Sequence, residues 1–135
     1  PCAVEAIDRI AKKYNLKVIY DNAHGFGVTY MGKSLFEYGD VSTASFHATK
    51  IFHTVEGGAV VSQSAEVLKV LSFMRNFGHN GPDKFEMLGI NGKNSEFHAA
   101  MGLAILPQFR LILERRAELV AYYKVALRNL NVQYQ

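Results

Sequence analysis

The stretch VSTASFHATKIFHTVEGGAVVS, residues 41–62, decides the fold because it holds two strand signals separated by one loop. Its first six residues, 41–46, are rich in β-branched and apolar side chains, which predicts a buried strand. Its last four residues, 59–62, follow the pair Gly57-Gly58 and predict another strand. The loop between them carries one lysine, Lys50, flanked by two histidines. An isolated lysine is ordinarily a solvated surface residue, so its meaning depends on what surrounds it.

The segments on either side extend this pattern into alternating helices and strands. The further expected elements are a helix over 4–14, a strand over 18–20 that ends at Asp21, a helix from Ser64 to about Arg75, a Gly- and Asn-rich loop over 76–93, a helix from Ser95, and a long helix over 107–135. This alternation predicts an α/β fold with a mostly parallel sheet and flanking helices, forming a single domain over residues 1–135. Because ligands bind beyond the carboxyl ends of parallel strands, Asp21 and the segment after Phe46 are expected to face one cleft.

Composition excludes several classes of protein. The 135 residues are 49% hydrophobic and 20% charged, which is typical of a soluble globular chain with a genuine core. The formal charge is only +3 and the basic residues are dispersed, which argues against nucleic acid as a partner. The longest apolar run, 99–106, is far shorter than the roughly 20 residues of a membrane-spanning helix, so no membrane partner is expected. The single cysteine, Cys2, cannot form an internal disulfide, which favours a reducing, cytoplasmic compartment.

Common ligand motifs are missing from the sequence or incomplete in it. The glycines after His24 do not complete the dinucleotide motif G-x-G-x-x-G, because its last position falls on Tyr30. Five histidines occur, but no pair has the spacing of a zinc site, so we expect no metal. Asp21 and His24 could belong to a hydrolase, yet no G-x-S-x-G elbow supplies a nucleophilic serine. The residues around Lys50 are therefore the main candidates for chemistry.

Four residues at or near the ends of the predicted strands match the needs of pyridoxal 5′-phosphate. Asp21 ends one strand, His24 follows three residues later, Ser45 ends the next strand, and Lys50 follows five residues after that. This cofactor requires a carboxylate at its ring nitrogen, a ring to stack on, a phosphate donor and an amine for a Schiff base. Each residue also has an ordinary interpretation, as a turn residue, a polar loop residue, a buried hydroxyl or an exposed lysine. Residue type and spacing leave both interpretations open.

The longer stretch VIYDNAHGFGVTYMGKSLFEYGDVSTASFHATKIFHTVEGGAVVS, residues 18–62, resembles the DegT/StrS-type sugar aminotransferases, which are fold-type I pyridoxal-phosphate enzymes. Their pattern runs as D-x-A-[HQ]-x-x-G, a spacer ending in G-D, S-F-x-x-x-K and G-E-G-G-A. Downstream, GINGKNSEFHAAMGLAILPQF, residues 89–109, is similar to their segment G-x-N-x-[RK]-x-x-E-x-x-A-A-x-G-x-x-Q-L, and Arg115-Arg116 fits the helix that follows it. The resemblance covers nearly the whole chain and implies the central part of a fold-type I large domain.

The resemblance implies a role for each matching residue. Lys50 would form the Schiff base with pyridoxal phosphate, Asp21 would pair with its ring nitrogen, and His24 would stack on its ring. Ser45 would bind the cofactor phosphate. Asn91 would match an asparagine that reaches across a homodimer interface to the neighbouring subunit's cofactor phosphate. The reaction implied moves an amino group from an amino acid, such as glutamate, to a keto group of a nucleotide-linked sugar.

Two further residues and one strand are included in this prediction. His47, between Ser45 and Lys50, is expected near the site, and Lys93 is a possible substrate or near-site residue. The strand over 59–62 is expected to run antiparallel to an otherwise parallel sheet, as the resemblance implies.

The chain also departs from the family pattern. Val55 stands where a glycine is usual, Asn22 stands where an alanine is common, and residues 107–109 shift the expected Gln-Leu. Because Val55 replaces a glycine, the family pattern does not predict the backbone conformation of the turn after Lys50. A further Gly/Ser/Thr-rich turn and a small C-terminal domain of the family are not in the sequence, and the chain starts at Pro1 rather than Met. We therefore expect a central piece of a large domain that binds cofactor poorly by itself, with residues 107–135 leading toward the missing small domain.

Two alternatives to transamination remain at this point. A related sugar dehydratase would use the same cofactor, but that branch replaces the Schiff-base lysine with histidine, whereas this chain has Lys50. A truncated, non-catalytic fragment or a regulatory or structural homologue would keep the fold and the dimer surface without the chemistry. Absorbance of bound cofactor distinguishes this last alternative from the two enzymes.

Overall fold

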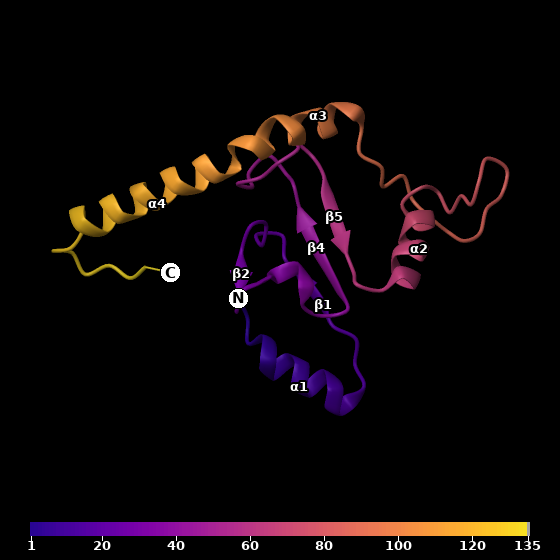
Figure 1. Cartoon of the computed structure of the whole chain (residues 1–135), viewed down its shortest axis with the longest axis horizontal. Helices are drawn as coiled ribbons and strands as arrows, with labels where there is room; N and C mark the ends of the chain where they lie inside the picture. The colour runs from indigo at the N-terminus through magenta and orange to yellow at the C-terminus, as the bar shows by residue number, and fades with distance from the viewer. Residues whose placement is uncertain (135) are drawn as a thin grey trace.

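The computed structural model describes residues 1–134, and a three-stranded sheet lies at its centre (Figure 1). Strand β1 (Ile19–Asp21) pairs in parallel with β4 (Val41–Ser45), and β4 pairs antiparallel with β5 (Gly58–Val61), which gives the order β1-β4-β5. These strands confirm the three that the sequence predicts, including the antiparallel direction of the third. In the register, Asp21 lies opposite Thr43, so Ser45 extends two residues beyond the end of β1.

A small hairpin and a 3-10 turn fill the connection between the two parallel strands. The hairpin pairs β2 (Thr29–Tyr30) with β3 (Lys33–Ser34), and the turn η1 (Leu35–Glu37) follows directly. The Ser34 side chain accepts a hydrogen bond from Phe36 N, and Glu37 accepts one from Ser34 N, which caps the turn. The sequence analysis did not predict this hairpin, because strands of two residues are too short to show an alternating pattern.

Four α-helices surround the sheet or project from it. They are α1 (Val4–Tyr14), α2 (Ala65–Met74), α3 (Glu96–Ile105) and α4 (Phe109–Ala126), with a 3-10 turn η2 (Leu106–Gln108) joining the last two. The predicted helix starts at Ser64 and Ser95 are confirmed, and both serines are caps: the Ser64 hydroxyl accepts from Val67 N, and the Ser95 hydroxyl accepts from His98 N.

The final helix is shorter than the sequence predicts. Helical backbone was expected over 107–135, but α4 covers Phe109–Ala126 and its last turn closes through Leu127 N and Tyr123 O. Asn129 and Asn131 follow at once, and asparagine is a poor residue for helix interiors because its side chain competes for backbone hydrogen bonds. The expected length of this helix was therefore wrong at its C-terminal end.

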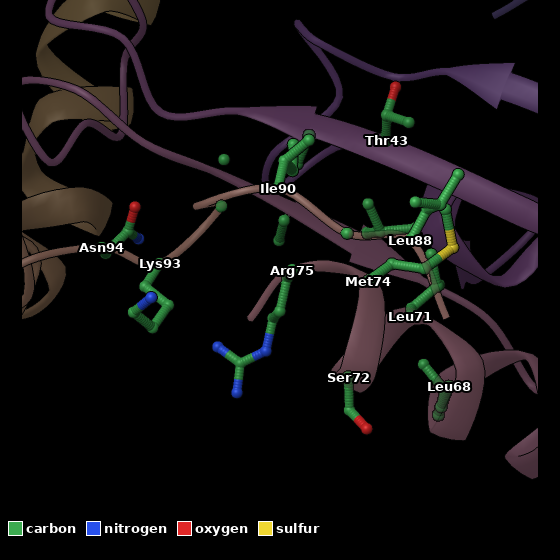
Figure 2. Close-up of a pocket in the computed structure, with 16 residues that line it drawn as sticks. Thr43, Leu68, Leu71, Ser72, Met74, Arg75, Leu88, Ile90, Lys93 and Asn94 are labelled. Carbon is green, nitrogen blue, oxygen red and sulfur yellow. The ribbon is translucent and has the colours of Figure 1, made fainter. Parts of the chain in front are cut away.

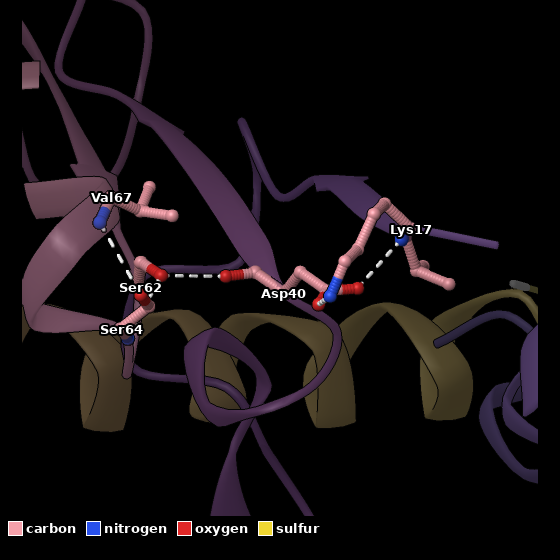
Figure 3. A network of polar contacts seen from close by, with 6 residues as sticks. Lys17, Asp40, Ser62, Ser64 and Val67 are labelled. Atoms are coloured by element: carbon pink, nitrogen blue, oxygen red, sulfur yellow. Dashed lines mark hydrogen bonds and ion pairs between the residues drawn. The ribbon is translucent and has the colours of Figure 1, made fainter. Parts of the chain in front are cut away.

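A polar network ties the start of β1 to the start of α2 (Figure 3). The Asp40 carboxylate accepts hydrogen bonds from Lys17 Nζ at 2.8 Å and from Val18 N at 2.9 Å. The Ser62 hydroxyl donates to Asp40 O at 2.7 Å and accepts from Ser64 N at 3.2 Å. Segments on both sides of β4 are thereby joined through polar groups rather than through apolar packing.

The apolar core is small and centres on four phenylalanines, Phe26, Phe46, Phe52 and Phe109. The rings of Phe26 and Phe52 stack with centroids 4.2 Å apart, and Phe46 and Phe109 pack edge-on against them. The large core expected from composition is not found: among residues 1–134, the buried hydrophobic residues are Val4, Ala11 and Phe52. Helix α4 projects away from the sheet, and most of its apolar stripe is exposed (Figure 1).

Candidate functional site

Two polar residues end neighbouring parallel strands. Asp21 is the last residue of β1 and Ser45 is the last residue of β4, so both lie at the same edge of the sheet. The exposed Asp21 carboxylate accepts a hydrogen bond from Ala23 N at 3.1 Å. The Ser45 hydroxyl, half-buried, accepts one from His47 N at 3.4 Å. This is the edge at which the sequence analysis expects a cleft.

The loops after these strands bring Lys50 to His24. Lys50 Nζ lies 3.0 Å from His24 Nε2, although the residues are 26 positions apart in the sequence. Lys50 is half-buried, and its backbone N–H donates to His47 O at 2.9 Å, which closes a turn after β4. Within residues 1–134 the Lys50 amine has no carboxylate partner. An amine held by an imidazole nitrogen, rather than neutralised by an acid, remains available to react.

The four phenylalanines explain why these loops meet. Phe26 follows His24 by two residues, Phe46 follows Ser45 directly, and Phe52 follows Lys50 by two residues. Because the three rings pack together, the polar residues beside them are brought to one side of the sheet. The packing of these aromatic rings therefore holds the neighbouring polar residues in position.

His47 lies beside this group with its ring orientation fixed. Its Nδ1 accepts from Thr49 N at 3.3 Å and lies 2.9 Å from the Thr49 hydroxyl. Because Nδ1 is an acceptor, the ring hydrogen is on Nε2, which lies 3.7 Å from the Glu56 carboxylate. The sequence analysis expected His47 near the site but did not identify Glu56 as its partner.

The turn between Lys50 and β5 is tight. Val55, the residue found where a glycine is usual, has a φ of 68°, in the left-handed region that β-branched residues rarely adopt. A Cβ at Gly58 would lie 2.7 Å from Ala44 O, and one at Gly57 would overlap the Thr54 hydroxyl. The two glycines are thus required by close approach to Thr54 and to the backbone of β4.

Asn91 and Lys93 lie on a separate part of the molecule, beside the C-terminal end of α2. Lys93 Nζ donates to Asn91 Oδ1 at 2.8 Å and lies 4.1 Å from the centroid of the Phe77 ring. The backbone of this segment is tied to the residues after α2, since Gly92 N donates to Arg75 O at 2.8 Å. Over the described residues, neither side chain has a hydrogen bond or ion pair with the strand-end residues.

A large apolar groove adjoins this loop (Figure 2). Its volume is about 1090 Å³, and it is lined by residues of β4 and β5, by α2 and by residues 88–90 and 92–94. Its apolar lining includes Leu68, Leu71, Met74, Leu88 and Ile90, and Arg75 and Lys93 lie at one side. The apolar face of α2 could be predicted from its helical spacing, whereas the groove depends on how the loop folds beside it.

The donor set at the strand ends fits pyridoxal phosphate. A carboxylate, an imidazole, a hydroxyl and an amine without an acidic partner lie at one edge of the sheet, and these are the groups that the cofactor's ring, phosphate and aldehyde need. Among residues 1–134, no group of three or more His, Cys, Asp or Glu side chains is arranged to hold a metal ion. In the same part of the chain, no helix has the length and apolarity needed to cross a membrane.

Comparison with known proteins decides the family. The profile described as the DegT/DnrJ/EryC1/StrS aminotransferase family matches residues 1–135. The chain belongs to this family. Membership agrees with the resemblance of residues 18–62 and 89–109, and it makes the strand-end residues the first place to look for aminotransferase chemistry.

Individual relatives are nucleotide-sugar transaminases by their descriptions. The dTDP-4-amino-4,6-dideoxy-D-glucose transaminase of Shigella dysenteriae is 44% identical over 130 residues, which are 96% of this chain and 35% of the relative. A structure of Helicobacter pylori PseC, an aminotransferase of pseudaminic acid biosynthesis by its description, superposes with a TM-score of 0.89 at 28% identity, covering 99% of this chain and 37% of that one. A structure of DesI with its TDP-sugar product has a TM-score of 0.89 at 35% identity, covering 97% of this chain and 33% of that one.

These superpositions confirm the predicted α/β fold class, that of pyridoxal-phosphate-dependent aminotransferases. The expectation of a mostly parallel sheet is not met within residues 1–134, because the central sheet has one parallel and one antiparallel pair. The chain spans about a third of the length of the curated relatives it matches.

Proposed function

We propose that this chain carries the cofactor site of a pyridoxal-phosphate-dependent aminotransferase that acts on a nucleotide-linked keto sugar, with an amino acid such as glutamate as the donor. The observation that carries the proposal is the approach of Lys50 Nζ to His24 Nε2, beside the strand-end residues Asp21 and Ser45. Relatives described as sugar transaminases support the substrate class. A cytoplasmic location belongs to the same proposal and is supported by the free, exposed thiol of Cys2.

Each residue has a defined part in this proposal. Bound pyridoxal phosphate supplies an electron sink for negative charge on the substrate carbon. Asp21 would favour a protonated ring nitrogen, His24 would offer a ring face, and Ser45 would donate its hydroxyl to the phosphate. Lys50 would hold the cofactor through its amine, and the same Nζ would be the group that takes up and returns a proton.

The lysine also separates this proposal from the dehydratase alternative. A dehydratase of this type carries histidine at the position of Lys50, whereas the amine here lies against an imidazole and has no acidic partner among residues 1–134. The non-catalytic alternative is favoured by one observation, the exposure of large apolar side chains on α2, α3 and α4. Surfaces of that kind are ordinarily covered by further protein, so cofactor binding by the 135 residues alone is expected to be weak.

The proposal is tested by spectroscopy with pyridoxal phosphate. The wild-type chain and Lys50→Ala are compared for a visible absorption band, followed by borohydride reduction and peptide mapping. A band that disappears in the variant, together with a reduced adduct on Lys50, is the expected result. The same measurement on a chain extended at both ends distinguishes an incomplete site from a missing one. An extended chain with no lysine-dependent band would refute the proposal.

We also propose that the enzyme is a homodimer in which Asn91 serves the partner subunit's cofactor phosphate. Support comes from its exposed position on the 76–93 loop, where its side-chain oxygen accepts from Lys93 rather than from a strand-end residue. In the extended protein, Lys50→Ala and Asn91→Ala are each expected to lose transaminase activity. Mixing the two should restore about a quarter of it, since random pairing gives half heterodimers, each with one intact site. Mixtures no more active than their components would contradict the shared site.

A further inference from the structure

Asn22 lies between Asp21 and the turn that leads to His24, and both hydrogens of its side-chain amide are used. Asn22 Nδ2 donates to Leu35 O at 3.1 Å and to Ser42 Oγ at 3.1 Å. These acceptors belong to η1 and to β4, so a single side chain joins the end of β1 to two other elements.

The partner hydroxyl is itself firmly held. Ser42 is fully buried, at 0% exposure, and its hydroxyl donates to Tyr38 O at 3.3 Å. A buried hydroxyl with both a donor and an acceptor partner has little freedom to reorient. Asn22 is therefore attached to a fixed point of the sheet rather than to a mobile surface group.

The backbone of Asn22 is fixed as well. Asn22 N donates to Thr43 O at 3.0 Å, and Gly25 N donates to Asn22 O at 2.8 Å. Packing is close here, because a Cβ at Gly25 would lie 3.0 Å from the Cβ of Asn22. Asn22 thus contributes both backbone and side-chain bonds to the turn over 21–25.

We propose that Asn22 is a positioning residue for the cofactor site, which holds the Asp21 carboxylate and the His24 ring in place through its bonds to Leu35 and Ser42. The inference rests on the proposed function for its chemistry. Without the amide, the turn loses its side-chain bonds to η1 and to β4 and keeps its backbone bonds, the bond from Ala23 N to the Asp21 carboxylate and the contact of His24 with Lys50. The carboxylate is then held only through its own turn, and its position toward the ring nitrogen is less fixed. Asn22 touches neither cofactor nor substrate in this proposal; it acts through its two neighbours.

The first test needs no cofactor. Amide hydrogen exchange is measured for wild type, Asn22→Ala and Asn22→Asp; the aspartate keeps the shape of the side chain but loses both donated hydrogens. Exchange of the Ala23 and Gly25 amides should accelerate about tenfold in both variants, the effect expected for losing one net hydrogen bond or more. The Phe46 amide, which donates to Gly57 O at 2.8 Å, should keep its wild-type rate. Equal changes at all three amides, or no change at Ala23, would overturn the proposal.

The second test uses the cofactor-loaded extended protein. Asn22→Ala should raise the dissociation constant for pyridoxal phosphate about tenfold and move the pH midpoint of its visible band, because the carboxylate no longer holds the ring nitrogen's charge. The matched control is Asn80→Ala, which removes an exposed amide that donates to Glu86 at 3.3 Å and should leave both values unchanged. Absence of the band in wild type would refute the proposed function, whereas a wild-type band with an unaltered Asn22→Ala would refute only the role of Asn22.

Discussion

The strand-end residues and the two polar residues of the 76–93 loop match the same family pattern, yet the structure holds them in different ways. Lys50 and His24 contact each other across 26 positions, supported by packed aromatic rings. Asn91 and Lys93 contact each other across two positions and are exposed, and their segment is bonded to the end of α2 through its backbone and through Lys93 over the Phe77 ring. The strand-end residues are therefore brought together by long-range contacts within the chain, whereas Asn91 and Lys93 are exposed at the surface.

The largest difference in stability between the two regions is expected when a phenylalanine in each is replaced by alanine. Phe52 is 8% exposed and stacks on Phe26, whereas Phe85 in the loop is 68% exposed and contacts the His79 ring. Phe52→Ala should lower the free energy of unfolding by about 3 kcal/mol through lost packing, and Phe85→Ala should change it by less than about 0.5 kcal/mol. Urea denaturation of both variants measures the difference. Equal losses would show that the loop belongs to the same cooperative core.

A second prediction tests the outward-facing loop. Asn91→Ala removes an amide whose oxygen accepts from Lys93, both exposed, so the stability of the chain should stay within about 0.5 kcal/mol of wild type. Cofactor affinity of the extended dimer should nevertheless fall at least tenfold, the cost of losing a hydrogen bond to a charged phosphate. Thermal unfolding and cofactor titration are measured on the same samples. A parallel loss of stability and affinity would make Asn91 a structural residue.

A smaller effect on stability is expected from backbone strain at Val55, in the turn after Lys50. Val55 has a φ of 68°, a conformation that costs an L-residue about 1–2 kcal/mol and that glycine adopts freely. After the entropy cost of glycine is subtracted, Val55→Gly should stabilise the chain by about 0.5–1 kcal/mol. The matched control is Val60→Gly, at an ordinary position in β5, which should destabilise by a similar amount. Destabilisation by both substitutions would mean that the Val55 side chain contributes more than its backbone costs.

The smallest effect concerns the polar network at the opposite end of the sheet. Hydrogen bonds from Lys17 and from Val18 N hold the pKa of Asp40 below its usual value of 3.8. Because the pKa is lower in the folded state, the stabilisation is present above pH 3.8 and is lost as the pH falls through the folded-state pKa. Wild type should therefore lose more stability than Asp40→Asn between pH 5 and about pH 2, although the exposed pair contributes little. If the melting temperatures of the two proteins changed equally across this pH range, the link between Asp40 protonation and stability would be contradicted.

Much of this molecule could be predicted from local sequence. The apolar spacing of residues 4–14 and the capping serines Ser64 and Ser95 locate helices, because each depends on backbone and side-chain groups a few residues apart. The strand over 41–45 and its antiparallel neighbour follow in the same way from β-rich runs and from the family pattern. The length of α4 was overestimated, since the apolar stripe continues at Leu127 and Leu130, beyond the last helical residue.

The sequence by itself determined the main helices and the three strands of the central sheet, the family and which polar residues end the strands, because these depend on short-range pattern. Only the tertiary structure decided that the hairpin of β2 and β3 forms, that Lys50 meets His24 and that Asn22 joins η1 to β4. The last two depend on strand pairing, ring packing and loop closure between residues far apart in the chain. Such contacts are set by the three-dimensional path of the backbone, and no local pattern specifies them.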